Sequence, residues 1–141
     1  MNKPKKQKSF SRYVKLEDYK VFDYEIPEIF LDFVINKNAV NVTTKLKLVK
    51  KNKNTNNLTL DGTDILIKQI FIDDSVLEEE YYKQQKNNLI IKNINKDNFL
   101  IKIEGIIKPK ENTSLLGMYE SNGIITTQCE AEGFRRDKFS L

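Results

Sequence analysis

The sequence predicts an all-β domain, built mostly from antiparallel strands in a sandwich or saddle-like arrangement. Two observations lead to this prediction. Runs in which apolar and polar residues alternate recur along the chain, and alternation with period two is typical of a strand that has one wet face. Roughly seven short predicted strands, separated by turn-forming residues, follow one another at intervals of about ten residues, a spacing typical of sandwiches.

The clearest alternation lies in the first third of the chain. Residues 29–35 alternate, Asn36-Lys37-Asn38 is a turn signal, and residues 40–48 alternate again. Together they predict an antiparallel hairpin. In these two runs and in a later strand, the side chains that we expect to point inward are Leu31, Phe33, Val42, Leu46, Leu48, Ile101 and Ile103.

Further strands are predicted in the chain after this hairpin. Residues 65–72 are strongly apolar and β-branched, which predicts a strand buried on both faces. Short strands are also predicted at residues 58–60, which Asp61-Gly62 ends, at residues 89–91, and at residues 99–104, before Pro109.

Residues 78–83 contain three adjacent glutamates. They could form a helical turn, but are interpreted as an exposed connection or an edge strand. The glutamates could be taken as metal ligands. A solvated run of charges is the favoured interpretation, because adjacent side chains diverge.

The composition is that of one globular domain. The chain has 141 residues, of which 39% are hydrophobic and 31% charged, enough for one core but not for two. Its net charge of +4 comes almost entirely from Lys, since Arg occurs only at Arg12, Arg135 and Arg136. Proteins that read nucleic acids favour Arg for its bidentate contacts, so we expect no nucleic-acid partner.

Two residue counts restrict the chemistry. The chain contains no His, which excludes a His general base and the usual His-based zinc site. Cys129 is alone, so no internal disulfide can form, and no base is present to activate its thiol. We therefore expect no catalytic residue and no metal ligand in this chain.

The cellular location can also be predicted from the sequence, from its apolar runs and its single Cys. No apolar run approaches the ~20 residues of a membrane helix. A single Cys and the absence of a signal-like apolar run favour a cytoplasmic location, and no membrane partner is expected.

We expect two regions along the chain. Residues 1–12 hold four lysines and few apolar residues, and predict a basic, disordered tail; a basic arm for nucleic acid or membrane is the alternative interpretation. Residues 13–141 predict one β domain with no internal boundary.

Residues 126–136 have neither helical nor strand periodicity. An amide, a thiol, two carboxylates and two guanidinium groups lie within this short stretch, in the order Thr126-Thr127-Gln128-Cys129-Glu130-Ala131-Glu132-Gly133-Phe134-Arg135-Arg136. A polar loop of this density usually ends a domain or meets a ligand.

Four segments in order resemble the N-terminal domain of the bacterial aminopeptidase N family, which consists of zinc-dependent gluzincin peptidases. The first is Leu16-Glu17-Asp18-Tyr19-Lys20, with Asp23-Tyr24 after it, and the second is Leu58-Thr59-Leu60-Asp61-Gly62-Thr63-Asp64. The third is Asn112-Thr113-Ser114-Leu115-Leu116-Gly117-Met118-Tyr119, with Ser for Ala and Met for Leu. The fourth, residues 128–135, matches the family's Q-C-E-A-E-G-F-R loop at every position.

The chain also departs from the family pattern. The H-E-x-x-H helix, the downstream glutamate ligand of zinc and the G-x-M-E-N segment are all absent. The resemblance therefore implies a fragment that ends before the catalytic domain and is inactive alone. It implies zinc in the parent enzyme, with none bound by this fragment.

The resemblance also implies two residues that contact a peptide substrate. Glu130 is similar to the carboxylate that receives the substrate's α-ammonium group, beside a second glutamate that is missing here. Gln128 is similar to a residue of the first specificity pocket, where an amide can donate to and accept from a peptide backbone. The parent would then remove N-terminal amino acids from peptides. The alternative hypothesis is a free-standing β-sandwich that binds a protein or a polyanion.

Overall fold

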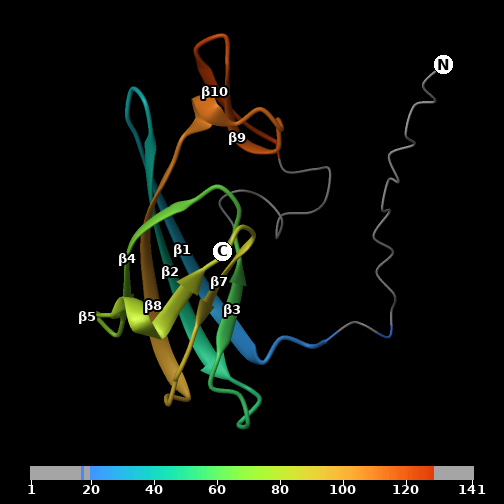
Figure 1. The fold of residues 1–141 in the computed structure, drawn as a ribbon, viewed down its shortest axis with the longest axis vertical. Helices are drawn as coiled ribbons and strands as arrows, with labels where there is room; N and C mark the ends of the chain where they lie inside the picture. The colour runs from blue at the N-terminus through green and yellow to red at the C-terminus, as the bar shows by residue number, and fades with distance from the viewer. Residues whose placement is uncertain (1–16, 18–19, 129–141) are drawn as a thin grey trace, which may run out of the picture.

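The structure, a computed structural model, describes residue 17 and residues 20–128 (Figure 1). These residues form three antiparallel sheets joined by short connections, so the predicted all-β, mostly antiparallel class is confirmed. The larger part of the domain is a two-layered sandwich, and a separate hairpin lies at one end of it (Figure 1).

The large layer is a five-stranded sheet in the order β1-β2-β8-β4-β5. Its strands are β1 (Tyr24–Ile35), β2 (Val40–Lys50), β8 (Asn98–Ile107), β4 (Leu66–Ile72) and β5 (Ser75–Val76). The first two form the hairpin expected around Asn36-Lys37-Asn38, with Ile35 opposite Val40.

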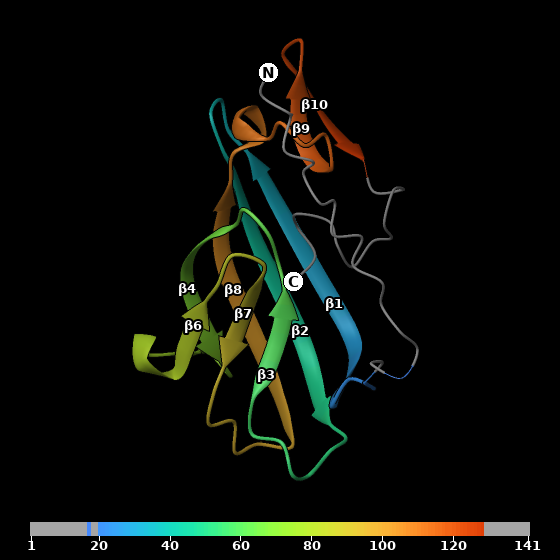
Figure 2. The same cartoon turned by 45° about the vertical axis from the view of Figure 1, so that its right-hand side comes forward.

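The small layer is a three-stranded sheet in the order β3-β7-β6. Its strands are β3 (Leu58–Asp61), β7 (Asn88–Ile91) and β6 (Tyr82–Gln84). The short 3-10 helix η2 (Glu79–Tyr81) leads into β6, an edge strand. Residues 78–83 thus contain the helical turn, which was the less favoured interpretation, as well as the start of the expected edge strand. Figure 2 shows this sheet in front of β2, β8 and β4, with β1 to its side.

The third sheet is the hairpin of β9 (Gly117–Ser121) and β10 (Ile124–Gln128). The 3-10 helix η3 (Pro109–Glu111) and the loop after it connect the hairpin to β8. Pro109 follows the end of β8 closely, as its missing N–H predicts.

The main core lies between the two layers of the sandwich. Alternate residues of β2 and β8 point into it, and the small sheet covers them with alternate residues of β3 and β7. Its buried members are Tyr24, Leu46, Leu48, Leu58, Leu60, Ile70, Leu89, Ile91, Ile94, Phe99, Ile101 and Ile103.

A second, smaller core joins the sandwich to the hairpin. It consists of Val40 and Val42 at the start of β2, Ile107 at the end of β8, Ile65 before β4, and Met118 of β9. Phe33, Ile67 and Ile125 pack against this cluster. The hairpin is therefore held on the sandwich by side-chain packing at the end where β2 begins.

Most of the expected inward side chains are in these cores. Val42, Leu46, Leu48, Ile101 and Ile103 are at most 4% exposed, which confirms the prediction for β2 and β8. Leu31 and Phe33 of β1 lie on the same face but are only half-buried, because the small sheet does not extend over the edge strand.

The prediction for residues 65–72 was wrong in one respect. Residues 66–72 form β4, but the strand is not buried on both faces: Leu66 on its outer face is 54% exposed. The small sheet covers only the inner face, and the neighbour of β4 on its other side is the two-residue strand β5.

Gly105 of β8 lies between the two cores and permits a close approach of β4. A Cβ atom at this position would lie 2.9 Å from Cγ2 of Ile65 and 3.3 Å from the carbonyl oxygen of Leu66. The register of β4 against β8 shifts between Ile67 and Gln69, beside this glycine. The shift lets Ile65 and Ile67 reach the second core while Ile70 remains in the first.

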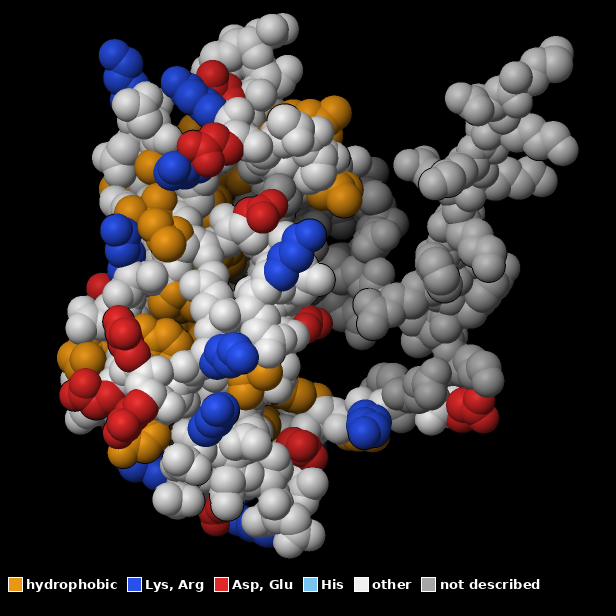
Figure 3. All heavy atoms as spheres, in the orientation of Figure 1, with side chains coloured by type: hydrophobic (Ala, Val, Ile, Leu, Met, Phe, Trp, Pro, Cys, Tyr) orange, Lys and Arg blue, Asp and Glu red, His pale blue; other side chains and the backbone are white. Residues whose placement is uncertain are grey.

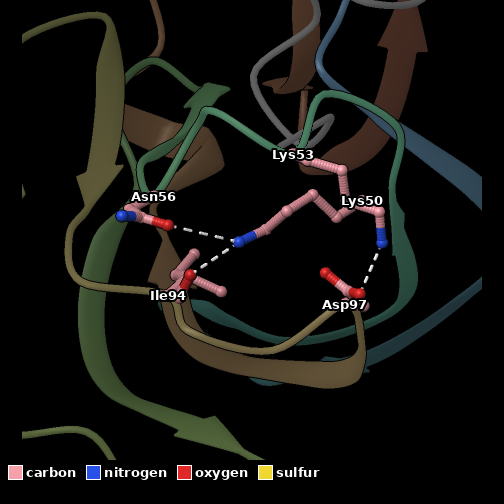
Figure 4. A network of polar contacts seen from close by, with 5 residues as sticks. All are labelled: Lys50, Lys53, Asn56, Ile94 and Asp97. Atoms are coloured by element: carbon pink, nitrogen blue, oxygen red, sulfur yellow. Dashed lines mark hydrogen bonds and ion pairs between the residues drawn. The ribbon is translucent and has the colours of Figure 1, made fainter.

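Lys50 is a buried cation at the far end of β2. Its Nζ atom donates to the carbonyl oxygen of Ile94 at 2.8 Å and to Oδ1 of Asn56 at 3.4 Å, and the residue is 7% exposed (Figure 4). Nearby, Lys53 forms an exposed ion pair with Asp97. Lys50 thus connects the loop after β2 to the loop before β8 from inside.

We predict that Lys50→Met destabilises the domain by about 1–3 kcal/mol, because it leaves the buried carbonyl of Ile94 without its donor. Lys53→Met is the matched control, and should cost less than about 1 kcal/mol because its ion pair with Asp97 is exposed. Urea unfolding of both variants measures the two costs. Equal losses would contradict the role assigned to the buried amine.

The β9–β10 hairpin as a candidate functional site

The hairpin ends in Gln128, one of the two predicted substrate-contacting residues. The sequence predicted a loop without strand periodicity around Gln128; the structure corrects this, since Gln128 is the last residue of β10 and pairs with Gly117 of β9. β9 and β10 pair from Ser121 opposite Ile124 to Gly117 opposite Gln128. The turn residues Asn122 and Gly123 have φ angles of 51° and 81°, as a two-residue type I′ turn requires. This turn fixes the register, and so fixes which face of the hairpin each side chain occupies.

The two faces of the hairpin differ in what they contact. Met118 and Ile125 lie on one face and pack on the second core. Gln128 lies on the opposite face, since side chains alternate along a strand, and it is half-buried. The amide of Gln128 is therefore directed away from the packed side of its own hairpin.

Two residues that the sequence did not single out share this face with Gln128. Thr126 precedes it by two positions on β10, and Tyr119 is directly opposite Thr126 on β9. Both are half-buried. The sequence contained a signal for them. A two-residue turn at Asn122-Gly123 sets the register of the hairpin, and this register places Tyr119 and Thr126 on the face of Gln128.

Asn112 organises the loop that leads into β9. Its Nδ2 atom donates to the carbonyl oxygens of Leu116 and Met118 at 2.7 and 2.8 Å. Its Oδ1 atom accepts from the backbone N–H and the hydroxyl of Ser114 at 3.1 and 2.9 Å. The segment that resembled the family's N-T-A-L-x-G-L-Y pattern thus starts with a loop, which its first residue closes, and then continues into β9.

The backbone of this loop explains the glycine that follows. Leu115 and Gly117 both have positive φ angles, of 57° and 71°. A left-handed conformation is easy for glycine and costly for other residues. Gly117 therefore lets the chain turn into β9, and it places no side chain opposite Gln128.

A shallow pocket lies beside the loop. It has a volume of about 450 Å³ and is bounded by the start of β4, the end of β8, η3 and β9, with Ile65, Leu66, Ile107, Asn112 and Met118 among its lining residues. Two ion pairs brace η3 nearby, from Lys108 to Glu111 at 3.0 Å and from Lys110 to Glu120 of β9 at 3.7 Å.

Glu130, the other predicted substrate-contacting residue, lies outside the described residues, as do Cys129 and the rest of residues 129–141. The described part of the predicted site is therefore Gln128, together with the hairpin that positions it.

The described residues whose pKa values are shifted lie outside the β9–β10 hairpin. The pKa of Asp73 is lowered, first by the backbone N–H of Leu100 and then by Lys96, and the pKa of Asp97 is lowered by Lys53. Burial raises the pKa of Tyr24. These groups belong to turns and to the main core, and none of them lies in the β9–β10 hairpin.

The described residues offer no metal centre. Residue 17 and residues 20–128 contain no group of three His, Cys, Asp or Glu residues arranged to hold a metal ion. None of the helices in this part of the chain is long and apolar enough to cross a membrane. Figure 3 shows Lys side chains interspersed with Asp and Glu over the face drawn, so the charges there are mixed in sign.

The chain is similar to known aminopeptidases over most of its length. It is 34% identical over 125 residues to aminopeptidase N of Haemophilus influenzae, which is 89% of this chain and 14% of the relative. It is also 34% identical over 124 residues to aminopeptidase N of Escherichia coli, which is 88% of this chain and 14% of the relative. No family profile matches the chain.

A solved structure shares both fold and sequence. The crystal structure of Legionella pneumophila aminopeptidase A in complex with aspartic acid matches 87% of this chain with a TM-score of 0.74 and 34% identity, and the match covers 15% of that chain. The described β domain is thus of a kind that also occurs in an aminopeptidase of known structure. More particularly, the chain belongs to the aminopeptidase N family, and it spans about 14% of the length of the curated relatives it matches.

We predict that Asn112→Ala loosens the loop before β9 and destabilises the domain by about 1–3 kcal/mol, since two carbonyl oxygens lose their donor. Asn112→Asp tests the same point in a side chain of nearly equal size, which keeps an acceptor for Ser114 but offers no N–H donor. Thermal unfolding of both variants is the measurement. A variant as stable as the parent would show that the amide does not hold the loop.

Proposed function

We propose that this domain is the N-terminal, substrate-anchoring part of a zinc-dependent aminopeptidase, and that Gln128 and Glu130 contact the N-terminus of a peptide substrate. The observation that carries the proposal is the 34% identity to aminopeptidase N along nearly the whole chain. The family's Q-C-E-A-E-G-F-R loop, kept at residues 128–135, adds the specific residues.

The chemistry of a free amino terminus favours this assignment. A substrate α-ammonium group in a partly dry site needs a carboxylate close to it, where the attraction is weakly screened. Glu130 supplies such a charge, and the amide of Gln128 can donate to and accept from the first peptide unit. The direction of Gln128, away from the core-facing side of its hairpin, agrees with a contact outside the domain.

The zinc chemistry belongs to another part of the enzyme in this proposal. The donor set of this chain does not fit the metal, since it has no His and the described residues hold no metal-binding cluster. The role of this domain is to hold one end of the peptide while groups elsewhere act on the bond. A cytoplasmic location belongs to the same proposal.

The loop residues are tested in a chimera in which this chain replaces the matching segment of Escherichia coli aminopeptidase N. We predict that Glu130→Gln in the chimera lowers kcat/KM for free-amine substrates roughly thirtyfold. This factor corresponds to a loss of about 2 kcal/mol of transition-state stabilisation. Much of the loss should appear as a raised KM, because the anchor acts in the ground state and the transition state alike. Zinc content should not change.

The matched control for this test is Glu132→Gln, the same substitution two residues further along. It should leave the kinetics of the chimera close to those of the parent chimera. If Glu130→Gln also keeps the parent's kinetics, Glu130 is not the anchor. An inactive parent chimera with native zinc content and unchanged thermal stability would count against the assignment of the whole domain.

A further prediction concerns the chain by itself. Purified without a partner, it should neither hold stoichiometric zinc nor hydrolyse aminoacyl anilides, because it lacks the ligands for the metal. Metal analysis after dialysis against zinc and a continuous anilide assay measure the two properties. Metal-dependent turnover that copurifies with the chain would refute this division of roles.

A further inference from the structure

The turn between β9 and β10 is the only Asn-Gly step in the sequence, at Asn122-Gly123. A dipeptide of this kind is chemically reactive, because the backbone nitrogen of the second residue can attack the side-chain amide of the first. Glycine hinders this attack less than any other residue, since it has no side chain. The turn therefore has a reactivity that the proposed peptidase function does not use.

The turn is open to solvent. Asn122 and Gly123 are both exposed, and the tip of the hairpin points away from the sandwich (Figure 1 and Figure 2). A Cβ atom built on Gly123 would have no described atom within 4 Å apart from those of its neighbours in the chain. Water and hydroxide can thus reach both of the groups that would react.

The two groups also lack the hydrogen bonds that hold their counterparts elsewhere. Within the part of the chain that the structure describes, neither the side-chain amide of Asn122 nor the backbone N–H of Gly123 has a hydrogen-bond partner. Asn36 and Asn112, in contrast, donate from their amides to carbonyl oxygens. The amide of Asn122 is therefore free to turn toward the nitrogen of Gly123.

A second dipeptide of similar chemistry provides an internal comparison. Asp61-Gly62 could form the same cyclic imide, but the N–H of Gly62 donates to the carbonyl oxygen of Asn87 at 3.0 Å. This nitrogen cannot attack the neighbouring side chain without breaking that bond, and a carboxylate is a poorer electrophile than an amide. The hydrogen bonding and the chemistry both favour reaction at Asn122.

We propose that Asn122 deamidates spontaneously, and that the isoaspartate formed there loosens the hairpin that carries Gln128. Hydroxide removes the N–H proton of Gly123, and the nitrogen attacks Cγ of Asn122. The side-chain Nδ2 takes up a proton and leaves as ammonia, which completes a succinimide ring. Water then opens the ring at either carbonyl group, so the net reaction consumes one water molecule and releases one ammonia.

Ring closure requires a rotation about the Cα–C bond of Asn122, out of the turn conformation. A two-stranded hairpin is only marginally stable by itself, and the end of a ladder frays at little cost in free energy. The pair of Ser121 and Ile124 at the tip is such an end. The rotation can therefore occur while the sandwich, whose strands belong to other sheets, stays folded.

The two products have different effects on the hairpin. Ring opening between the nitrogen and Cγ gives aspartate, and Asp-Gly favours the same type I′ turn as Asn-Gly. Opening on the main-chain side gives isoaspartate, in which the backbone passes through Cβ and Cγ and is one carbon longer.

The longer backbone affects the whole hairpin, because a two-residue turn sets the register of the strands that it joins. The disturbed pairing extends toward Gly117 and Gln128, the last pair of the ladder. This inference concerns the hairpin alone, and it does not depend on the proposed peptidase function.

Storage of the purified chain at mildly alkaline pH, in water labelled with heavy oxygen, tests the modification. Peptide mapping by mass spectrometry should show that Asn122 gains the label ahead of the other asparagines and becomes both aspartate and isoaspartate. The rate should rise in proportion to the hydroxide concentration, since the attacking nitrogen must lose its proton. Asn122→Gly, which keeps a dipeptide that favours the same turn, is the matched control and should gain no label there.

Nuclear magnetic resonance tests the effect on the hairpin. In the isoaspartate form, purified by ion exchange, the cross-strand contacts between the α protons of β9 and β10, such as those of Met118 and Thr127, should be lost. The contacts between β2 and β8 should remain. Asn122→Asp has the new charge on a normal backbone, and should keep the contacts in both places.

Three results would overturn the inference. If other asparagines lose their amides first, Asn122 is not a selective site. If isoaspartate forms at Asp61 as fast as at Asn122, the free N–H of Gly123 does not select the site. If the isoaspartate form and Asn122→Asp give the same contacts across β9 and β10, the longer backbone does not loosen the hairpin.

Discussion

The pairing of β2 with β8 is the interaction on which the rest of the domain depends. These strands match from Val40 opposite Ile107 to Val49 opposite Asn98 without interruption. Their inward side chains enter both cores, since Leu46 and Ile101 belong to the main cluster and Val42 to the smaller one. Each fully buried Leu or Ile contributes about 1.5–3 kcal/mol, so this pair of strands carries much of the favourable free energy of folding.

How much of the fold the sequence predicts depends on how strictly each strand alternates. β2 and β8 each alternate over ten residues, and their inward residues were identified correctly. β4 is apolar at five of its seven positions without a regular alternation, so its pattern did not reveal that Leu66 would face outward beside a two-residue neighbour. Leu31 and Phe33 have the alternation of a core strand, but what covers a strand depends on the length of the opposite sheet.

Part of the candidate site could also be predicted from the sequence, but by resemblance to a known loop and not by strand alternation. Gln128 was chosen as a candidate because its neighbours in the sequence match a known loop, and the hairpin register now gives its face. Tyr119 and Thr126 were missed because cross-strand neighbours are defined by a register, which no single residue reveals. Asn112 was noted only as part of a motif, whereas its four hydrogen bonds depend on a backbone path that includes the left-handed residue Leu115.

The attachment of the β9–β10 hairpin has a consequence for motion. No strand of the described sandwich continues into the hairpin's ladder. Among the described residues, the hairpin is held by a small apolar cluster, the bonds of Asn112 and a partly exposed ion pair. A segment held in this way opens at a lower free energy than the core strands do, and it opens as one unit. The amides of β9 and β10 should therefore exchange with solvent faster than those of β2 and β8, and Gln128 would move with the hairpin while the sandwich stays folded.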